Sequence, residues 1–597
     1  MKRGLLTGWS DLTSCQNLLF FAQLINELLF DFSIPSNRIP TLNSHYLCND
    51  AARAIRSIDK QGVPEGTLKP IVEELFNSLQ NDRLYRRIEQ NPLRLFAKHE
   101  NNKYHIVTKI DSLSYYDQKT IVTALNEKYF QNDDYLNALK ENISKIVKFN
   151  NAQEQGELFQ LTKSLVTELV NKGYKTNYIF NKVNTFYFSS ESLITNPAVI
   201  DDFLNLFTFL NNEYTVVLLV ENTVKCLIDF IAHESFSNIL QPRTSSEIEA
   251  KFLIKTQNQR FLTIKNNALD PYSAVEKAKQ SINHYSSIFR LSDHVFDCDL
   301  DSTRCGVYDN ENNFTFIDVS VSAVRRAKTP ARDQIQSRMR FSIQAIEKLA
   351  SPDYSQQQQA LLSAISFHAL SINSTSAQNQ LLDLWAIFEA ILDVGKFHTS
   401  DRINQICSFL IPILKKRYIY TLFKQLSEDI RNYNIDQFKL ITAGAGTENQ
   451  EVQKIFEFIV LKEHDKKREE FISLCSDIPL LRERIVYFNE HMCDAQSIYQ
   501  FVEKHCDRLR WQIMRIYRNR NLIIHNGEAM PYLKLLVENL HSYVDEFLEY
   551  VILNYSRGHS LNSMMLEIFT RETEWVDIFN RRGKELNREI IEFLMVE

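Results

Sequence analysis

The sequence contains little glycine and little proline, with 13 residues of each in 597. These two residues end helices and form the tight turns between β-strands, and they are abundant in all-β, linker-rich and collagen-like chains. Their scarcity therefore argues against those architectures and favours a mainly α protein. The chain is also too long for one ordinary core, so we expect about two to four domains.

The chain also lacks a strong net charge, clustered cysteines and a long apolar run. A net charge of −6 excludes a globally basic nucleic-acid-binding protein, although it allows a local basic patch. The nine cysteines form no CxxC pair, which is the pattern of free thiols in a reducing compartment, so we expect a cytoplasmic protein. No uncharged apolar stretch approaches ~18 residues, so we predict no membrane partner.

Motifs for metal-dependent and nucleotide-dependent catalysis are absent as well. The sequence contains no HExxH pair, Walker loop or clustered-carboxylate motif. Asp297, Asp299 and Asp301 imitate the start of an EF-hand loop. However, Ser302 stands where that loop needs glycine, and Tyr308 stands where it needs a glutamate. We therefore predict no metal site and no cofactor.

Hydrophobic periodicity divides the chain into three regions. Residues 1–213 are predicted to be a helix-rich N-terminal region to which the sequence assigns no function. Residues 214–335 are predicted to be a small α+β domain, and residues 336–597 a helical domain. The helices expected in the first region lie near 18–29, 68–80, 117–130 and 156–171.

The middle region differs because its apolar residues are β-branched and its runs are short. Strands are expected at 214–220, 252–255 and 261–264, a helix from Asp270-Pro271, and a β-hairpin from 307–308 with 314–317. The last region has helical periodicity almost throughout. Its helices are expected at 378–392, 401–430, 450–475, 496–525, 531–554 and 584–595.

The stretch from Arg515 to Gly527 concentrates the residues with chemical potential. Arg515, Arg518 and Arg520 lead to His525, and Asn526-Gly527 then supplies the left-handed conformation that ends helices. Arginine offers a planar fork of donors suited to phosphate, and histidine can exchange a proton near neutral pH. We therefore predict a site for phosphate chemistry, in which Asn521 could hold either the phosphate or the imidazole.

Helical geometry constrains this site. Arg520 falls on an apolar stripe, so it must find an anion, and Glu389 in the apolar helix 381–392 is the expected partner. Arg518 lies on the same face as His525. Arg520 and His525 are about 140° apart on an ideal helix. They can converge only if the helix loosens at its end or if two chains contribute across a twofold axis.

The run from Arg520 to His525 resembles the signature of the HEPN superfamily, which has an arginine, a polar residue directly after it and a histidine further on. The helix 381–392, with Trp385 and Glu389, is similar to the earlier acidic helix of that family. The closest likeness is to Apea-type HEPN domains, over roughly 340–560. Arg518-Asn519 with a longer gap before His525 also fits the signature.

The resemblance implies a dimerising helical bundle and a metal-independent endoribonuclease. His525 would be the general acid/base, Arg520 would stabilise the phosphorane, Asn521 would orient, and Glu389 would support the arginine, with Arg518 as the second choice of arginine. It implies RNA as substrate, with tRNA one candidate, and a setting in phage defence or toxin action with a phage-derived trigger or an antitoxin. The alternative is a non-catalytic HEPN module that binds RNA or a nucleotide or assembles partners.

Overall fold

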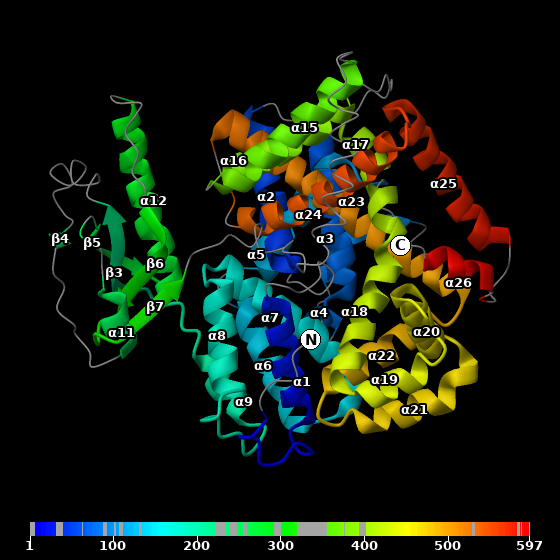
Figure 1. Cartoon of the computed structure of the whole chain (residues 1–597), viewed down its shortest axis with the longest axis horizontal. Helices are drawn as coiled ribbons and strands as arrows, with labels where there is room; N and C mark the ends of the chain where they lie inside the picture. The colour runs from blue at the N-terminus through cyan, green and yellow to red at the C-terminus, as the bar shows by residue number, and fades with distance from the viewer. Residues whose placement is uncertain are drawn as a thin grey trace.

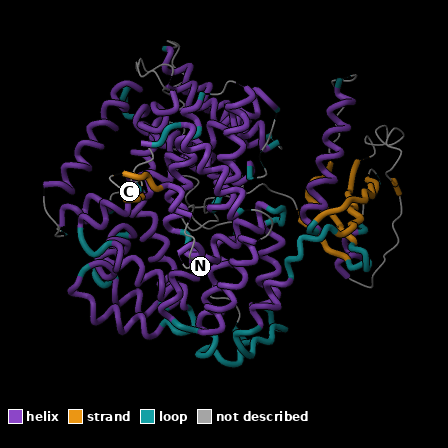
Figure 2. Tube along the Cα trace, turned by 180° about the vertical axis from the view of Figure 1, so that it is seen from behind, coloured by secondary structure: helices purple, strands orange, loops and turns teal. Residues whose placement is uncertain are grey.

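The structure is a computed structural model of the whole chain. It describes residues 6–30, 40–61, 64–86, 92–100, 103–106, 112–130, 134–221, 235–237, 247–254, 257, 259–291, 300–318, 355–374, 376–392, 402–527, 530, 532–581, 586 and 588–595. In the described part the fold is mainly α with one small α+β unit, as predicted. The α+β unit lies at one side of the helical body (Figures 1 and 2).

The N-terminal region is a group of helices around α1. Its helices are α1 (Gln16–Leu29), α2 (Ser44–Gln61), α3 (Lys69–Asn81), α4 (Arg83–Arg86), α5 (Tyr115–Tyr129), α6 (Asp134–Phe149), α7 (Gln155–Asn171), α8 (Thr176–Tyr187) and α9 (Val199–Asn205). A short hairpin of β1 (Ala97–Glu100) and β2 (Lys103–Ile106) joins them. All but the first residue of α1 are buried, because α6, α7, α8 and α22 surround it. Helices α1, α3, α5 and α7 confirm the four helices expected in this region.

The middle unit is a five-stranded antiparallel sheet in the order β4-β5-β3-β6-β7. Its elements are β3 (Asn212–Glu221), β4 (Ser235–Ser237), α11 (Glu247–Phe252), β5 (Gln259–Ala268), α12 (Pro271–Arg290), β6 (Leu300–Tyr308) and β7 (Phe314–Asp318). Alternate residues of the central strand β3 face opposite sides. Val216 and Leu218 pack towards α12, whereas Val217 and Leu219 pack towards the face of the sheet that contacts α11.

One strand prediction in this unit is wrong. Residues 252–255 were expected to form a strand, but Phe252 ends the short helix α11. Phe252 is buried against Phe261 and Tyr308 on one face of the sheet, and the Tyr308 hydroxyl donates a hydrogen bond to the buried Glu249 carboxylate at 2.6 Å. Tertiary packing of one aromatic side chain therefore decides the local structure. Of the three aspartates, Asp297 and Asp299 lie outside the described residues.

The C-terminal region contains the longest helices of the described chain. They are α15 (Gln356–Asn373), α16 (Ala377–Leu392), α17 (Arg402–Lys416), α18 (Tyr418–Tyr433), α19 (Ile435–Ile441), α20 (Glu448–Val460), α21 (Asp465–Leu474), α22 (Pro479–His491), α23 (Ala495–Asn526), α24 (Leu533–Ser556), α25 (Leu561–Arg581) and α26 (Arg588–Leu594).

Two of the long helices expected here are each divided. The pattern 401–430 becomes α17 and α18, because Arg417 leaves the helical conformation with φ −95° and ψ 0°. The pattern 450–475 becomes α20 and α21, because Leu461 is extended and the turn Lys462–His464 follows it. Neither break contains glycine or proline, so local sequence gave no sign of it.

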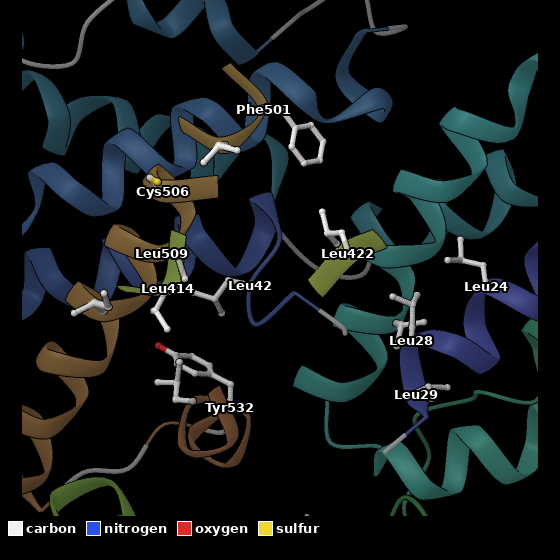
Figure 3. Close-up of a cluster of buried hydrophobic side chains, with 14 of the residues drawn as sticks. Leu24, Leu28, Leu29, Leu42, Leu414, Leu422, Phe501, Cys506, Leu509 and Tyr532 are labelled. Carbon is white, nitrogen blue, oxygen red and sulfur yellow. The ribbon is translucent and has the colours of Figure 1, made fainter. Parts of the chain in front are cut away.

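The N-terminal and C-terminal regions share one hydrophobic core, whereas the middle unit has its own. Figure 3 shows part of the shared core, where Leu42 of the N-terminal region lies near Leu414, Leu509 and Tyr532 of the C-terminal region. Residues far apart in sequence therefore form one continuous helical body. This body positions the end of α23.

Candidate active site at the end of α23

Helix α23 is a 32-residue helix with defined ends. The Asp494 side chain caps its N-terminus by accepting a hydrogen bond from the Ser497 amide at 2.7 Å. At the other end Gly527 has φ 67°, and its amide donates to the Ile523 carbonyl at 3.1 Å. The helix therefore ends at the predicted glycine and remains helical through His525.

Arg520 forms the ion pair expected with Glu389 of α16. One terminal nitrogen of Arg520 lies 3.2 Å and 3.4 Å from the two Glu389 carboxylate oxygens. The indole N–H of Trp385 also donates to this carboxylate at 3.0 Å. The Arg520 and Glu389 side chains remain 24% and 27% exposed, so the pair lies at the surface end of the helix packing rather than within the core.

Asn521 orients the arginine rather than the histidine in this chain. Its side-chain oxygen accepts a hydrogen bond from the other terminal nitrogen of Arg520 at 3.1 Å. The Glu389 backbone carbonyl accepts from Arg402 at 3.3 Å, and the Trp385 ring packs on the Tyr517 ring with centroids 5.5 Å apart. The guanidinium plane is thus held by an amide, a carboxylate and the aromatic pair behind that carboxylate.

His525 is exposed and has no hydrogen bond to another described residue. It follows Arg520 by five residues, which corresponds to about 140° of rotation and about 7.5 Å of rise on a regular helix. The helix does not loosen before Asn526, so Arg520 and His525 occupy different faces within one chain. The other route open to these two residues is a contribution from two chains.

The other two arginines of the stretch face the N-terminal region. Arg518 donates to Asp50 of α2 at 2.8 Å, and the Tyr532 hydroxyl donates to the same carboxylate at 3.2 Å. Arg515, only 2% exposed, pairs with Glu74 of α3. These arginines join the two halves of the helical body. The Arg518 side chain is 14% exposed and is held against the N-terminal region, whereas the Arg520 side chain is 24% exposed, which favours Arg520 as the arginine of the site.

Among the described thiols, that of Cys493 alone is exposed to solvent. Six of the seven described cysteines are buried, and none of the seven forms a disulfide. Burial raises the pKa of the Cys48, Cys475 and Cys506 thiols to about 12, which keeps them protonated at neutral pH.

No protein-family model, curated protein or solved structure matches this chain. Among the described helices, none is both long enough and apolar enough to cross a membrane.

Sequence reasoning did not find Asp50, Glu74 and Arg402, which contact the arginines or the acidic residue of this site. Asp50 and Glu74 contribute from helices more than 400 residues away in the chain, and no local pattern points to them. The sequence spacing did indicate that Trp385 and Glu389 are neighbours, because residues four apart lie on one helix face.

Proposed function

We propose that this protein is a metal-independent endoribonuclease of the HEPN type that acts as a homodimer. The observation that carries the proposal is the group at the end of α23. Asn521 and Glu389 orient the Arg520 guanidinium, and an exposed imidazole follows five residues later. The resemblance of this run to the HEPN signature supports the same assignment.

In the proposed reaction, a ribose 2′-hydroxyl attacks the neighbouring phosphorus. A bond forms from the 2′-oxygen to phosphorus, and the bond from phosphorus to the 5′-oxygen breaks. His525 is the general acid/base: an imidazole accepts the proton of the 2′-hydroxyl, and a proton is returned to the departing 5′-oxygen. The products are a 2′,3′-cyclic phosphate and a 5′-hydroxyl.

Arg520 stabilises the charge of the phosphorane in this proposal. A guanidinium has five N–H groups. The contacts to described residues engage one nitrogen with Asn521 and the other terminal nitrogen with Glu389. The remaining N–H groups can donate to phosphate oxygens while Glu389 holds the side chain in place.

The biological setting that we propose is phage defence or toxin action in the cytoplasm. RNA, with tRNA as one candidate, would be the substrate, and a phage-derived trigger or an antitoxin would control the nuclease. The N-terminal region is the candidate receiver of that signal, because Asp50 and Glu74 hold α23 directly.

The first test is cleavage of total cellular RNA by the whole chain in excess EDTA. Wild type is compared with His525→Ala and with His559→Ala, which removes a histidine that is 46% exposed outside the site. We expect new ends with wild type and His559→Ala, and none with His525→Ala. Cleavage that persists in His525→Ala, with the same ends, would exclude His525 as the catalytic residue.

A mixing experiment tests the composite site. Arg520→Ala and His525→Ala are each expected to be inactive, but a heterodimer of the two contains one site with both residues if the site spans two chains. After random exchange of chains, about a quarter of wild-type activity should return, because half of the dimers have one of two sites intact. Recovery of no activity would place both residues of a site in the same chain.

The alternative is a non-catalytic HEPN module that binds RNA or a nucleotide or assembles partners. The formed Arg520–Glu389 pair favours it to the extent that Glu389 already compensates the arginine charge. This alternative predicts saturable RNA binding without new RNA ends. Neither wild type nor His525→Ala would then cleave RNA.

A further inference from the structure

A second cluster of titratable side chains lies away from the candidate active site, between α15 and α24. His368 comes from α15, and His541 and Asp545 come from α24. His541 and Asp545 are four residues apart and therefore share one face of the helix. Figure 1 shows α15 at the outside of the helical body, next to α16 and α24.

The Asp545 carboxylate lies between the two imidazoles. Its oxygens lie 2.9 Å from His368 Nε2 and 3.3 Å from His541 Nδ1. One potential ligand atom of each residue lies within 4.8 Å of the others, and the two rings are 5.2 Å apart between centroids. His541 and Asp545 are only 6% and 8% exposed, whereas His368 is 24% exposed. The cluster is therefore buried on its α24 side and open to solvent on its α15 side.

Hydrogen bonding alone does not use every polar atom of this cluster. Nε2 of His541 is buried and has no hydrogen-bond partner in the described part of the chain. Buried polar atoms in folded proteins are nearly always paired, and an unpaired one beside other ligand atoms leaves room for a further group, such as a water molecule or an ion. A structural hydrogen-bond network is thus an incomplete account of His541.

We propose that His368, His541 and Asp545 bind a divalent transition-metal ion of the zinc type. Two imidazoles and one carboxylate are a ligand set typical of zinc and its neighbours, whereas magnesium and calcium prefer oxygen ligands alone. Zinc–ligand bonds of about 2.0–2.1 Å in a tetrahedron place neighbouring ligand atoms about 3.3 Å apart.

The ligand atoms of the cluster draw together when the ion binds. The widest spacing of 4.8 Å exceeds the tetrahedral spacing, and rotation of the partly exposed His368 ring is the motion available to close it. Any proton on a ligating ring nitrogen is released or moves to the other nitrogen of that ring. The fourth position is left to water, so the site has three protein ligands. The ion would join α15 to α24 within the described bundle.

Metal binding is tested on the whole chain after removal of metals with a chelator and dialysis. Cobalt(II) alone is the probe, because its visible absorption reports the ligand geometry. We expect one equivalent per chain for wild type and for His559→Gln, which changes an exposed histidine elsewhere. His368→Gln is expected to weaken cobalt binding at least about tenfold while leaving the circular dichroism of the metal-free protein unchanged.

A second measurement needs no variant. X-ray absorption of the zinc-loaded wild-type chain is expected to show nitrogen and oxygen neighbours, with the multiple scattering of two imidazoles and no sulfur. Failure of the metal-free chain to take up cobalt, equal affinity in His368→Gln, or a sulfur neighbour from a thiol such as Cys493 would each overturn the proposal. None of these results bears on RNA cleavage, so the two proposals fail separately.

Discussion

At the residue scale, Arg515 and Arg520 lie on the same helix and have a carboxylate partner each, but they differ in burial. The Arg515 side chain is 2% exposed, and its Nε also has no hydrogen-bond partner in the described chain. The Arg520 side chain is 24% exposed. Loss of a partner leaves an uncompensated buried charge in the first case and a solvated one in the second.

This difference predicts unequal costs for two equivalent substitutions. Glu74→Ala should lower the free energy of unfolding by about 3–5 kcal/mol, because it leaves the buried Arg515 unpaired. Glu389→Ala should lower it by only about 1 kcal/mol, because Arg520 is partly solvated. Urea unfolding of both variants and wild type measures the difference. Equal losses would mean that Arg520 is a structural residue of the core.

His505 gives a prediction about acid stability. Its ring stacks on the Tyr418 ring with centroids 3.5 Å apart. Burial, with a smaller contribution from the positive charge of Arg508, lowers the pKa of His505 from 6.5 to about 3. The unfolded chain therefore binds a proton between pH 6.5 and pH 3 that the folded chain does not bind, and stability must decrease as the pH decreases through this window.

The corresponding measurement compares wild type with His505→Gln by urea unfolding at pH 7 and pH 5. A titrating histidine of this kind contributes up to about 1.4 kcal/mol for each pH unit. We expect wild type to lose about 1–2 kcal/mol more than His505→Gln between these two pH values. Identical losses would show that His505 is protonated in the folded chain as readily as in the unfolded one.

At the scale of the element, the end of α23 depends on one glycine. Gly527 has φ 67°, and a Cβ built on it would meet no atom within 4 Å. Any penalty for alanine at this position therefore comes from the backbone conformation and not from a clash.

Gly66 is a matched control, since a Cβ there also meets nothing within 4 Å and its φ is not positive. Gly527→Ala should lower the free energy of unfolding by about 1 kcal/mol, whereas Gly66→Ala should leave it unchanged or raise it by about 0.4–1 kcal/mol. Hydrogen exchange of the peptide around Ile523 should become faster only in Gly527→Ala. Unchanged exchange there would mean that the helix end is held by packing instead.

Sequence patterns predicted the ends of elements where a residue type marks them, and failed where packing alone decides. Asn526-Gly527 marked the end of α23, and Asp270-Pro271 marked the start of α12. The break at Arg417 has no such residue, and the helix that ends at Phe252 was mistaken for a strand because its apolar residues suit both.

The contacts of the candidate site likewise include some that the sequence predicted and some that it did not. Arg520 and Glu389 were paired in advance, because a charge on an apolar stripe requires a partner on the nearest apolar helix. Asp50 was not predicted as the partner of Arg518, because the two are 468 residues apart in sequence. The His368–Asp545 contact was not predicted either, because the two residues are 177 apart in sequence.

At the scale of the whole molecule, the two terminal regions have one hydrophobic core and the sheet has its own. Helices with a common core lose their packing together, whereas a unit with its own core can unfold by itself. Pulse-labelling hydrogen exchange across a urea series should therefore show one transition for α1 to α9 with α15 to α26. A second transition is expected for β3 to β7.

The opposite outcome would also be informative. Separate transitions for the two terminal regions would mean that their common core contributes little to the stability of either. In that case Glu74→Ala would affect only the C-terminal helices, and its cost would be lower than the 3–5 kcal/mol expected above for a buried charge.

The pairs Arg515–Glu74 and Arg518–Asp50 couple the evolution of the two ends of the chain. A gene that exchanged its first third for an unrelated segment would leave Arg515, a buried cation of α23, without its carboxylate. We expect such a chimaeric chain to be less stable unless the segment that contains Arg515 is exchanged as well. Among descendants of this sequence, we expect positions 74 and 515, and positions 50 and 518, to change in concert, with loss of an acid accompanied by loss of its arginine.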